Sequence, residues 1–204
     1  MMRVRGSYKK SEVSRQQVLD AALKTLATQG YAKTSVSDIA RTAGMSKGAV
    51  HYHFESKDDL IEQVLQHCAD TMRDRVRQAW TRPGAPHERV LRALMELRAA
   101  RKTAGPELKV LADLMAQGLH DPKLQARVQR MLEDNRVQVA QGVAESLESL
   151  GIRPKIPSRV IPRLLLGVLD GLALHEFFDP SGEEDELEVT RALSAIVFSL
   201  FEVE

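Results

Sequence analysis

The side chains with the clearest chemical potential lie together in one segment, Lys47–His53, which reads KGAVHYH. Lys47 can donate hydrogen bonds to a guanine edge or to a phosphate oxygen. His51 and His53 are of a metal-ligand type, but residues two apart on a helix point about 200° apart and cannot share one ion. The segment therefore predicts contacts to nucleic acid and not a metal centre.

Two short helices with a tight corner between them are predicted to position this segment. Ser35 can cap the first helix, and Asp38, three residues on, completes a capping box. Gly44 ends that helix, because glycine adopts a positive φ at low cost. The pattern is that of a helix-turn-helix, whose first helix braces the DNA backbone and whose second helix enters the major groove.

The starts of these two helices supply further predicted DNA contacts. The free N–H groups at the start of the first helix favour a phosphate. The second helix is capped by a serine, and two small residues in its first turn admit a close approach to the groove. On these grounds the predicted contacts are Lys33, Thr34, Ser35, Ser46, Lys47, Gly48 and Ala49.

The segment at residues 30–60, GYAKTSVSDIARTAGMSKGAVHYHFESKDDL, resembles the DNA-binding signature of the TetR family of one-component transcriptional regulators. The resemblance covers roughly residues 14–60 without a gap. It implies that His51 and Tyr52 contact DNA, and that Lys57 contacts a phosphate from the start of the next helix. The family usually has a tyrosine where this chain has His51.

Composition indicates a helical protein of the cell interior. The chain has 204 residues, of which 43% are hydrophobic, and a single cysteine, Cys68, which excludes an internal disulfide. It shows no apolar run of about 20 residues and no signal peptide at its start, so we expect a cytoplasmic protein with no membrane contact.

The net charge of +1 hides an asymmetry. Residues 1–60 contain ten basic and six acidic residues, which gives this segment a charge of +4. From Glu176 onward there are one basic and nine acidic residues, which gives −8. Such a distribution suits a DNA-facing end and a DNA-averse end.

The chain is predicted to be all-α, with a three-helix helix-turn-helix head at residues 1–55 and a helical bundle body at residues 56–204, as in the TetR family. The N-terminal helix of the chain is expected to run from about Ser14 to Gly30. Residues 152–157 are expected to form a linker. Residues 1 to about 12 allow two interpretations: a frayed tail, or an arm that contacts DNA through Arg3, Arg5, Lys9 and Lys10.

The last two helices are predicted to pair two copies of the chain. The helix at 158–178 is apolar on nearly every face, and a final helix capped by Ser181 with Glu184 has one strong apolar stripe. Two such helices from each subunit would form a four-helix bundle, which the family resemblance also implies. The alternative is an ordinary core within one chain. The predicted interface residues are Leu165, Leu169, Leu172, Phe177, Leu193, Ile196, Val197 and Leu200.

No catalytic constellation, phosphate loop or metal-spaced Cys/His set is present, so we expect neither an enzyme nor a cofactor. The resemblance implies an effector cavity among the helices spanning about 60–180. Few formal charges fall at predicted core positions, which favours an apolar or weakly polar effector. Candidate lining residues, which could equally be plain core, are Met95, Leu111, Met115, Met131, Asn135, Leu169 and His175.

These features together predict a homodimeric transcriptional regulator that binds a double-stranded DNA operator as a repressor and is released by a small, largely apolar effector. Two alternatives stay open. One is a helical ligand-binding or scaffold protein whose head serves protein contacts, and the other is an all-α enzyme, which the lack of catalytic groups disfavours.

Overall fold

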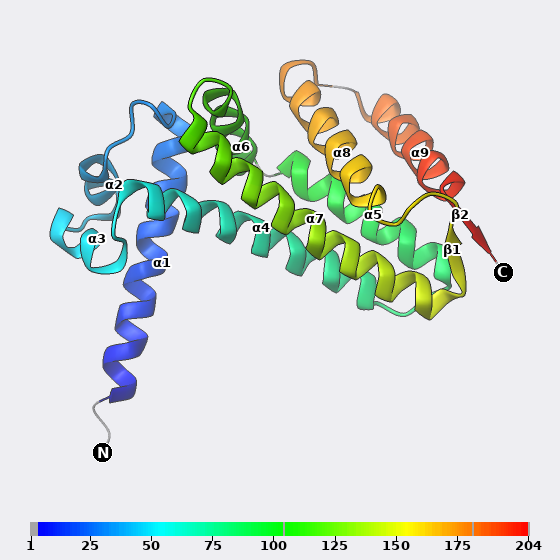
Figure 1. The fold of residues 1–204 in the computed structure, drawn as a ribbon, viewed down its shortest axis with the longest axis horizontal. Helices are drawn as coiled ribbons and strands as arrows, with labels where there is room; N and C mark the ends of the chain where they lie inside the picture. Colours follow the sequence, from blue (N-terminus) through cyan, green and yellow to red (C-terminus); the bar gives the residue numbers. More distant parts are fainter. Residues whose placement is uncertain (1–3, 104, 181, 204) are drawn as a thin grey trace. The chain divides into compact units, whose positions relative to one another are not determined.

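A computed structural model of the chain describes residues 4–103, 105–180 and 182–203. The described residues form nine α-helices and one two-stranded sheet (Figure 1). The elements are α1 (Val4–Gln29), α2 (Val36–Ala43), α3 (Lys47–His53), α4 (Lys57–Thr81), α5 (Pro86–Thr103), α6 (Gly105–Gly118), α7 (Pro122–Leu150), β1 (Ile152–Pro154), α8 (Ile161–Phe178), α9 (Glu183–Ser199) and β2 (Phe201–Val203). The predicted all-α fold is confirmed.

Glycines stop the helices where the sequence predicts. Gly30 follows α1 with φ +79° and Gly44 follows α2 with φ +66°, both in the left-handed region that side chains with a Cβ rarely adopt. Gly151 does the same after α7, with φ +60°. The three helix ends are therefore set by local backbone chemistry.

The start of α1 differs from the prediction. The helix begins at Val4, ten residues before Ser14, and the Ser14 hydroxyl donates to the Ser11 carbonyl at 2.8 Å from within the helix. The frayed-tail interpretation is therefore wrong for residues 4–12. The side chains of Arg5, Lys9 and Lys10, and Arg3 as a whole, lie outside the described part of the chain, as does the predicted cap Ser181.

The segment expected to be a plain linker contains a strand. Ile152 pairs with Val203 and Pro154 with Phe201 in an antiparallel β1–β2 ladder, and Lys155 N–H donates to the Leu200 carbonyl at 2.8 Å. The pairing lies about 50 residues apart in sequence, so no local signal announces it.

The chain forms two compact units. One, termed here the head unit, contains the described residues up to Asp70 together with Pro106–Val128. The other, the body unit, contains Thr71–Gly105 and the described residues from Gln129 onward. The head unit is larger than the predicted 1–55 domain, because the first turns of α4, most of α6 and the start of α7 belong to it.

Each unit has its own buried apolar side chains. In the head unit, Ile39 of α2 and Val50 of α3 are buried, and so is Val18 of α1. Both short helices pack against α1 (Figure 1). In the body unit, α5, α8 and α9 share a cluster formed by Leu94, Leu169, Leu193 and Val197. Among the described residues, no helix is both long and apolar enough to span a membrane.

Candidate nucleic-acid interface

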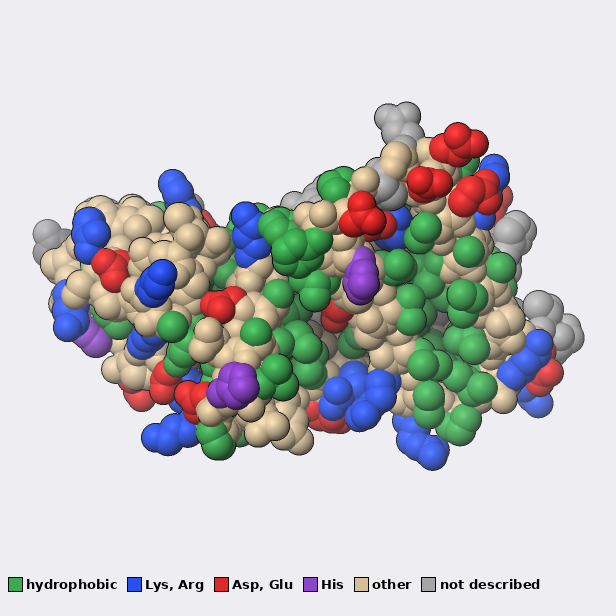
Figure 2. Space-filling view, turned by 90° about the horizontal axis from the view of Figure 1, so that it is seen from above, with side chains coloured by type: hydrophobic (Ala, Val, Ile, Leu, Met, Phe, Trp, Pro, Cys, Tyr) green, Lys and Arg blue, Asp and Glu red, His purple; other side chains and the backbone are tan. Residues whose placement is uncertain are grey.

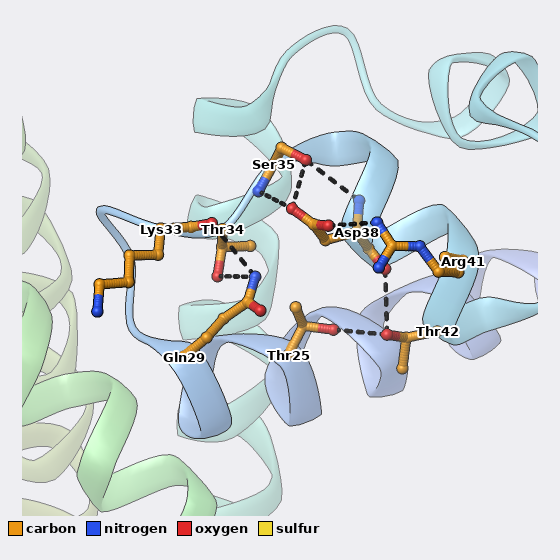
Figure 3. A network of polar contacts seen from close by, with 8 residues as sticks. All are labelled: Thr25, Gln29, Lys33, Thr34, Ser35, Asp38, Arg41 and Thr42. Atoms are coloured by element: carbon orange, nitrogen blue, oxygen red, sulfur yellow. Dashed lines mark hydrogen bonds and ion pairs between the residues drawn. The ribbon is translucent and has the colours of Figure 1, made fainter.

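The start of α2 carries the predicted capping box. The Ser35 hydroxyl accepts from Asp38 N–H at 3.2 Å, and an Asp38 carboxylate oxygen accepts from Ser35 N–H at 3.0 Å (Figure 3). The hydrogen bonds from the Ser35 hydroxyl and backbone lower the pKa of Asp38 below its ordinary value. The carboxylate therefore stays ionised at neutral pH and holds the entry of α2 in place.

The corner between α2 and α3 is fixed from both sides. Ser46 caps α3 by accepting from Ala49 N–H at 3.1 Å. Gln17 of α1 donates to the Ala43 carbonyl at 2.8 Å, which satisfies one of the free carbonyls at the end of α2. Thr25 of α1 donates to the Thr42 hydroxyl at 3.0 Å (Figure 3). The two short helices are thus bound to α1 by hydrogen bonds as well as by apolar packing.

This frame leaves the outer face of α3 exposed. Lys47, Gly48 and His51 are exposed, and Tyr52 is 77% exposed, whereas Val50 on the opposite side is 1% exposed. A Cβ added at Gly48 would meet only the Ser46 hydroxyl, at 3.8 Å. The protein itself therefore does not need glycine there, and the space remains available to a partner. Ser46 is exposed and Ala49 half-buried at the edge of this face.

The residues before α2 divide into two groups. Lys33 and Ser35 are exposed, as expected for a phosphate contact. Thr34 is only 4% exposed, and its hydroxyl donates to the Gly30 carbonyl at 2.6 Å. This hydrogen bond holds the turn after α1 in place and uses the only hydrogen that the Thr34 side chain could donate to DNA.

Lys57 has an internal partner. Its Nζ donates to the Tyr31 carbonyl at 2.7 Å and lies 4.0 Å from the centroid of the Tyr31 ring. Burial lowers the pKa of Lys57, and the neighbouring Asp58 carboxylate partly opposes this effect. This ammonium is therefore held on the turn after α1, unlike that of Lys47.

Tyr31 is the centre of a polar cluster that ties this turn to α6 and α7 within the head unit. Its N–H donates to the Asp113 carboxylate of α6 at 2.6 Å, and its hydroxyl lies 3.5 Å from the Asp58 carboxylate. Arg127 of α7 donates to the other oxygen of Asp58 at 2.9 Å. Burial and then the Asp58 charge raise the pKa of Tyr31.

The two histidines of α3 occupy different surroundings. His51 is exposed, while Nε2 of His53 lies 2.7 Å from the Ser14 hydroxyl of α1. Within the described part of the chain, no group of three His, Cys, Asp or Glu side chains is arranged to hold a metal ion.

One exposed cation near α3 was missed by the sequence reasoning. Arg41 lies on α2 with 77% of its side chain exposed, and it pairs with Asp38 at 2.5 Å (Figure 3). The sequence feature that indicates this exposure is the position of Arg41 on the polar side of α2, away from the buried Ile39 and Ala40.

The predicted interface residues of α8 and α9 are split between the interior and the surface. Leu169, Leu193 and Val197 are at most 5% exposed within the single chain, and Leu165 and Leu172 pack against them. These side chains have little surface left to bury against a second copy, because α5 already covers that side of both helices. Phe177 is 47% and Ile196 59% exposed, and Leu200 is half-buried.

The outward sides of α8 and α9 nevertheless carry large apolar side chains, and hydrophobic groups gather over these helices in Figure 2. The exposed members are Leu164, Val168, Leu174, Phe177 and Phe178 of α8, with Leu187, Ile196 and Phe198 of α9. One apolar face of α8 thus packs in the core of the body unit, and a second apolar face is exposed to solvent.

The predicted effector residues are not gathered in one unit. Leu111 and Met115 belong to the head unit, and Met95, Met131, Asn135, Leu169 and His175 belong to the body unit. Met95, Met115 and His175 are exposed, and Leu169 is core.

The body unit also buries charges that the sequence analysis did not anticipate. Arg98 and Arg101 of α5 are each 6% exposed. They pair with Glu176 and Asp170 of α8. Leu94, Arg98 and Arg101 recur at helical spacing, so the two arginines share the side of α5 that carries the core leucine.

Comparison with known proteins matches both parts of the chain. Residues 18–64 match the family described as bacterial regulatory proteins, tetR family. Residues 86–201 match the family described as BetI-type transcriptional repressor, C-terminal. The HTH-type transcriptional regulator BetI of Cronobacter sakazakii is 28% identical over 185 residues, which cover 89% of this chain and 87% of BetI.

Solved structures share the fold. The fatty acid degradation regulator FadR from Bacillus halodurans superposes with a TM-score of 0.73 at 17% identity, covering 89% of this chain and 94% of FadR. FadR from Bacillus subtilis, in complex with stearoyl-CoA, gives 0.68 at 19% identity, covering 91% and 96%. At these identities the likeness concerns the fold alone.

Proposed function

The chain belongs to the TetR family of bacterial transcriptional regulators, and from this premise we propose that it is an operator-binding repressor released by a small effector. The observation that carries the proposal is the exposed face of α3, because its basic and aromatic side chains point outward while the opposite side is locked to α1 and α2. The match of residues 86–201 to a repressor's C-terminal domain supports repression over activation.

In this proposal Lys47, His51 and Tyr52 contact base edges and phosphates in the major groove, while Lys33, Ser35 and Ser46 contact the backbone. Arg41 joins the backbone contacts. Lys57 and Thr34 are positioning residues, because both side chains make hydrogen bonds inside the head unit.

The regulator acts as a homodimer through the exposed sides of α8 and α9. Large apolar side chains exposed on both helices suit burial against a second copy, and a two-fold axis brings the same surface from each chain together. Two heads then read a pseudo-palindromic operator, with half-sites about 34 Å or more apart. An effector releases the DNA by binding more tightly to a body conformation in which the spacing of the heads does not fit the operator.

A band-shift experiment tests the central proposal. The protein is titrated onto fragments upstream of its own gene and onto random duplex of equal length, at moderate salt. We expect at least one fragment to bind far more tightly than random duplex, and Lys47→Met to reduce that preference. Equal binding of all fragments would contradict the assignment as a regulator of transcription.

A further inference from the structure

Two buried arginines lie in the body unit on the side of α5 that packs against α8. The side chains of Arg98 and Arg101 are each 7% exposed. Nη2 of Arg98 donates to Glu176 at 2.5 Å, and Nε of Arg101 donates to Asp170 at 2.5 Å. The four groups together carry a formal charge of zero.

Arg98 has donors left over. Its Nε and Nη1 are shielded from solvent and have no hydrogen-bond partner within the described part of the chain. A guanidinium carries five N–H groups, and leaving some of them buried without an acceptor is costly because the group is charged. Glu176 uses only Nη2. This arginine is therefore able to receive an acceptor that the described residues do not provide.

We propose that Arg98 binds the carboxylate of a small aliphatic acid, which receives hydrogen bonds from Nε and Nη1. This inference rests on the proposed function, because it names the chemical class of the effector. The planar guanidinium matches an oxyanion in geometry and charge. Leu94, one turn before Arg98, belongs to the apolar cluster of α5, α8 and α9, so the surroundings of the charged group on that side are apolar, as the chain of an aliphatic acid requires.

The charge of the cluster favours a monocarboxylate over a phosphate. Because Arg98, Arg101, Asp170 and Glu176 already balance, a bound carboxylate adds one net negative charge. A phosphate monoester adds up to two, and its burial beside Glu176 and Asp170 costs correspondingly more. We therefore expect the effector to have an apolar chain and one carboxylic acid group.

Calorimetric titration of the full-length protein without DNA tests the site. The probes are sodium octanoate, decanoate and dodecanoate, with 1-octanol as a neutral analogue and octyl phosphate as a phosphate analogue. Two variants that differ only at Arg98 are compared: Glu176→Gln, and Glu176→Gln combined with Arg98→Met. The second carries neither charge of the pair, so it folds without a buried unpaired charge, which circular dichroism verifies.

We expect the wild type to bind at least one carboxylate more tightly than octanol or octyl phosphate. Glu176→Gln should bind it as tightly or more tightly, because a competing negative charge is gone. The double variant should bind it about 10- to 100-fold more weakly, with octanol binding unchanged. Equal carboxylate binding by wild type and double variant would overturn the proposal, as would a preference for octyl phosphate or the absence of carboxylate binding to the wild type.

Operator binding, measured separately in the band shift, keeps the two proposals apart. Carboxylate binding that depends on Arg98 in a protein without operator binding would leave this site standing and remove the proposed function. Operator binding without carboxylate binding would do the reverse.

Discussion

Lys57 offers a sharp test of the head unit, because its ammonium is used inside the protein. Nζ donates to the Tyr31 carbonyl at 2.7 Å and lies 4.0 Å from the centre of the Tyr31 ring. Replacing Lys57 with Met keeps most of the apolar stem and removes both contacts. We expect the substitution to weaken folding and to leave the ionic part of operator binding unchanged.

The size of the effect follows from the two contacts that are lost. A hydrogen bond from a charged donor contributes about 1.5–3 kcal/mol net, and a partly exposed cation–π contact about 0.5–1 kcal/mol. Lys57 is only half-buried, so water can reach the freed Tyr31 carbonyl and recover part of this loss. We therefore expect about 1–2 kcal/mol, and a Tm lower by about 2–4 °C for each kcal/mol lost.

Two measurements on the same protein separate a positioning residue from a phosphate contact. Urea unfolding followed by circular dichroism gives the free energy of unfolding, and operator binding at several salt concentrations gives the salt slope. Lys47→Met is the matched control, since Lys47 is exposed and occupies the first position of α3 as Lys57 does of α4. The control should unfold within about 0.5 kcal/mol of wild type and lower the salt slope by about 0.9 per head.

The opposite pattern would refute the reasoning. If Lys57→Met lowers the salt slope by about 0.9 per head while its unfolding matches that of wild type, the ammonium leaves Tyr31 on DNA and contacts a phosphate. The family resemblance would then have described Lys57 better than its hydrogen bond does.

Ser35→Ala should lower the free energy of unfolding in urea by about 1 kcal/mol, because the cap of α2 is lost. The same change at the exposed neighbour Ser37 should have no measurable effect, and an equal loss at both positions would show that the cap does not stabilise α2. Burial raises the pKa of Cys68 from 9.0 to about 12, so at pH 8 iodoacetamide should alkylate it about a thousandfold more slowly in the native protein than in urea, and comparable rates would contradict the burial. Because the unfolded thiol ionises first, this group's contribution to stability should decline as pH rises above about 9. Ile196→Glu should sediment as a folded monomer, whereas Leu169→Ala should cost about 2–5 kcal/mol and remain dimeric; a dimeric Ile196→Glu protein would place the interface elsewhere.

Local chemistry made the helix-turn-helix predictable. Each feature of it depends on residues within one turn of one another: the Ser35–Asp38 box, the left-handed Gly44, and the Ser46 cap. Since these interactions do not depend on the rest of the fold, reading the sequence alone suffices for them. The same holds for α7, which begins at Pro122 and ends before Gly151.

The start of α1 shows where local reading fails. Residues 4–12 are polar and lack an apolar face, which is typical of a tail. However, once the following residues are helical, each further residue that joins the helix gains one hydrogen bond and loses only its own conformational freedom. No new nucleus has to form. No proline interrupts the segment, so α1 continues back to Val4.

The buried ion pairs of α5 show a different limit. A charged residue on an amphipathic helix is ordinarily solvated, so nothing in the sequence pattern marks Arg98 and Arg101 as buried. Their acidic partners, Glu176 and Asp170, lie 78 and 69 residues away on α8, and only the packing of α5 on α8 brings the charges together. A polar residue at an apolar helical position is the one sign in the sequence, and it does not say which partner compensates it.

The two lysines show how far residue type and position determine chemistry. Lys47 and Lys57 each follow a serine whose hydroxyl accepts from the N–H three residues on, and each occupies the first position of its helix. The Lys57 ammonium contacts the Tyr31 carbonyl and ring, whereas Lys47, on the outer face of α3, is exposed to solvent. The difference comes from the turn after α1, where Gly30 adopts a left-handed φ so closely beside α6 that a Cβ would lie 3.3 Å from the Asp113 carboxylate. The availability of a cation for DNA is therefore decided by the turn that packs on it and not by its own helix.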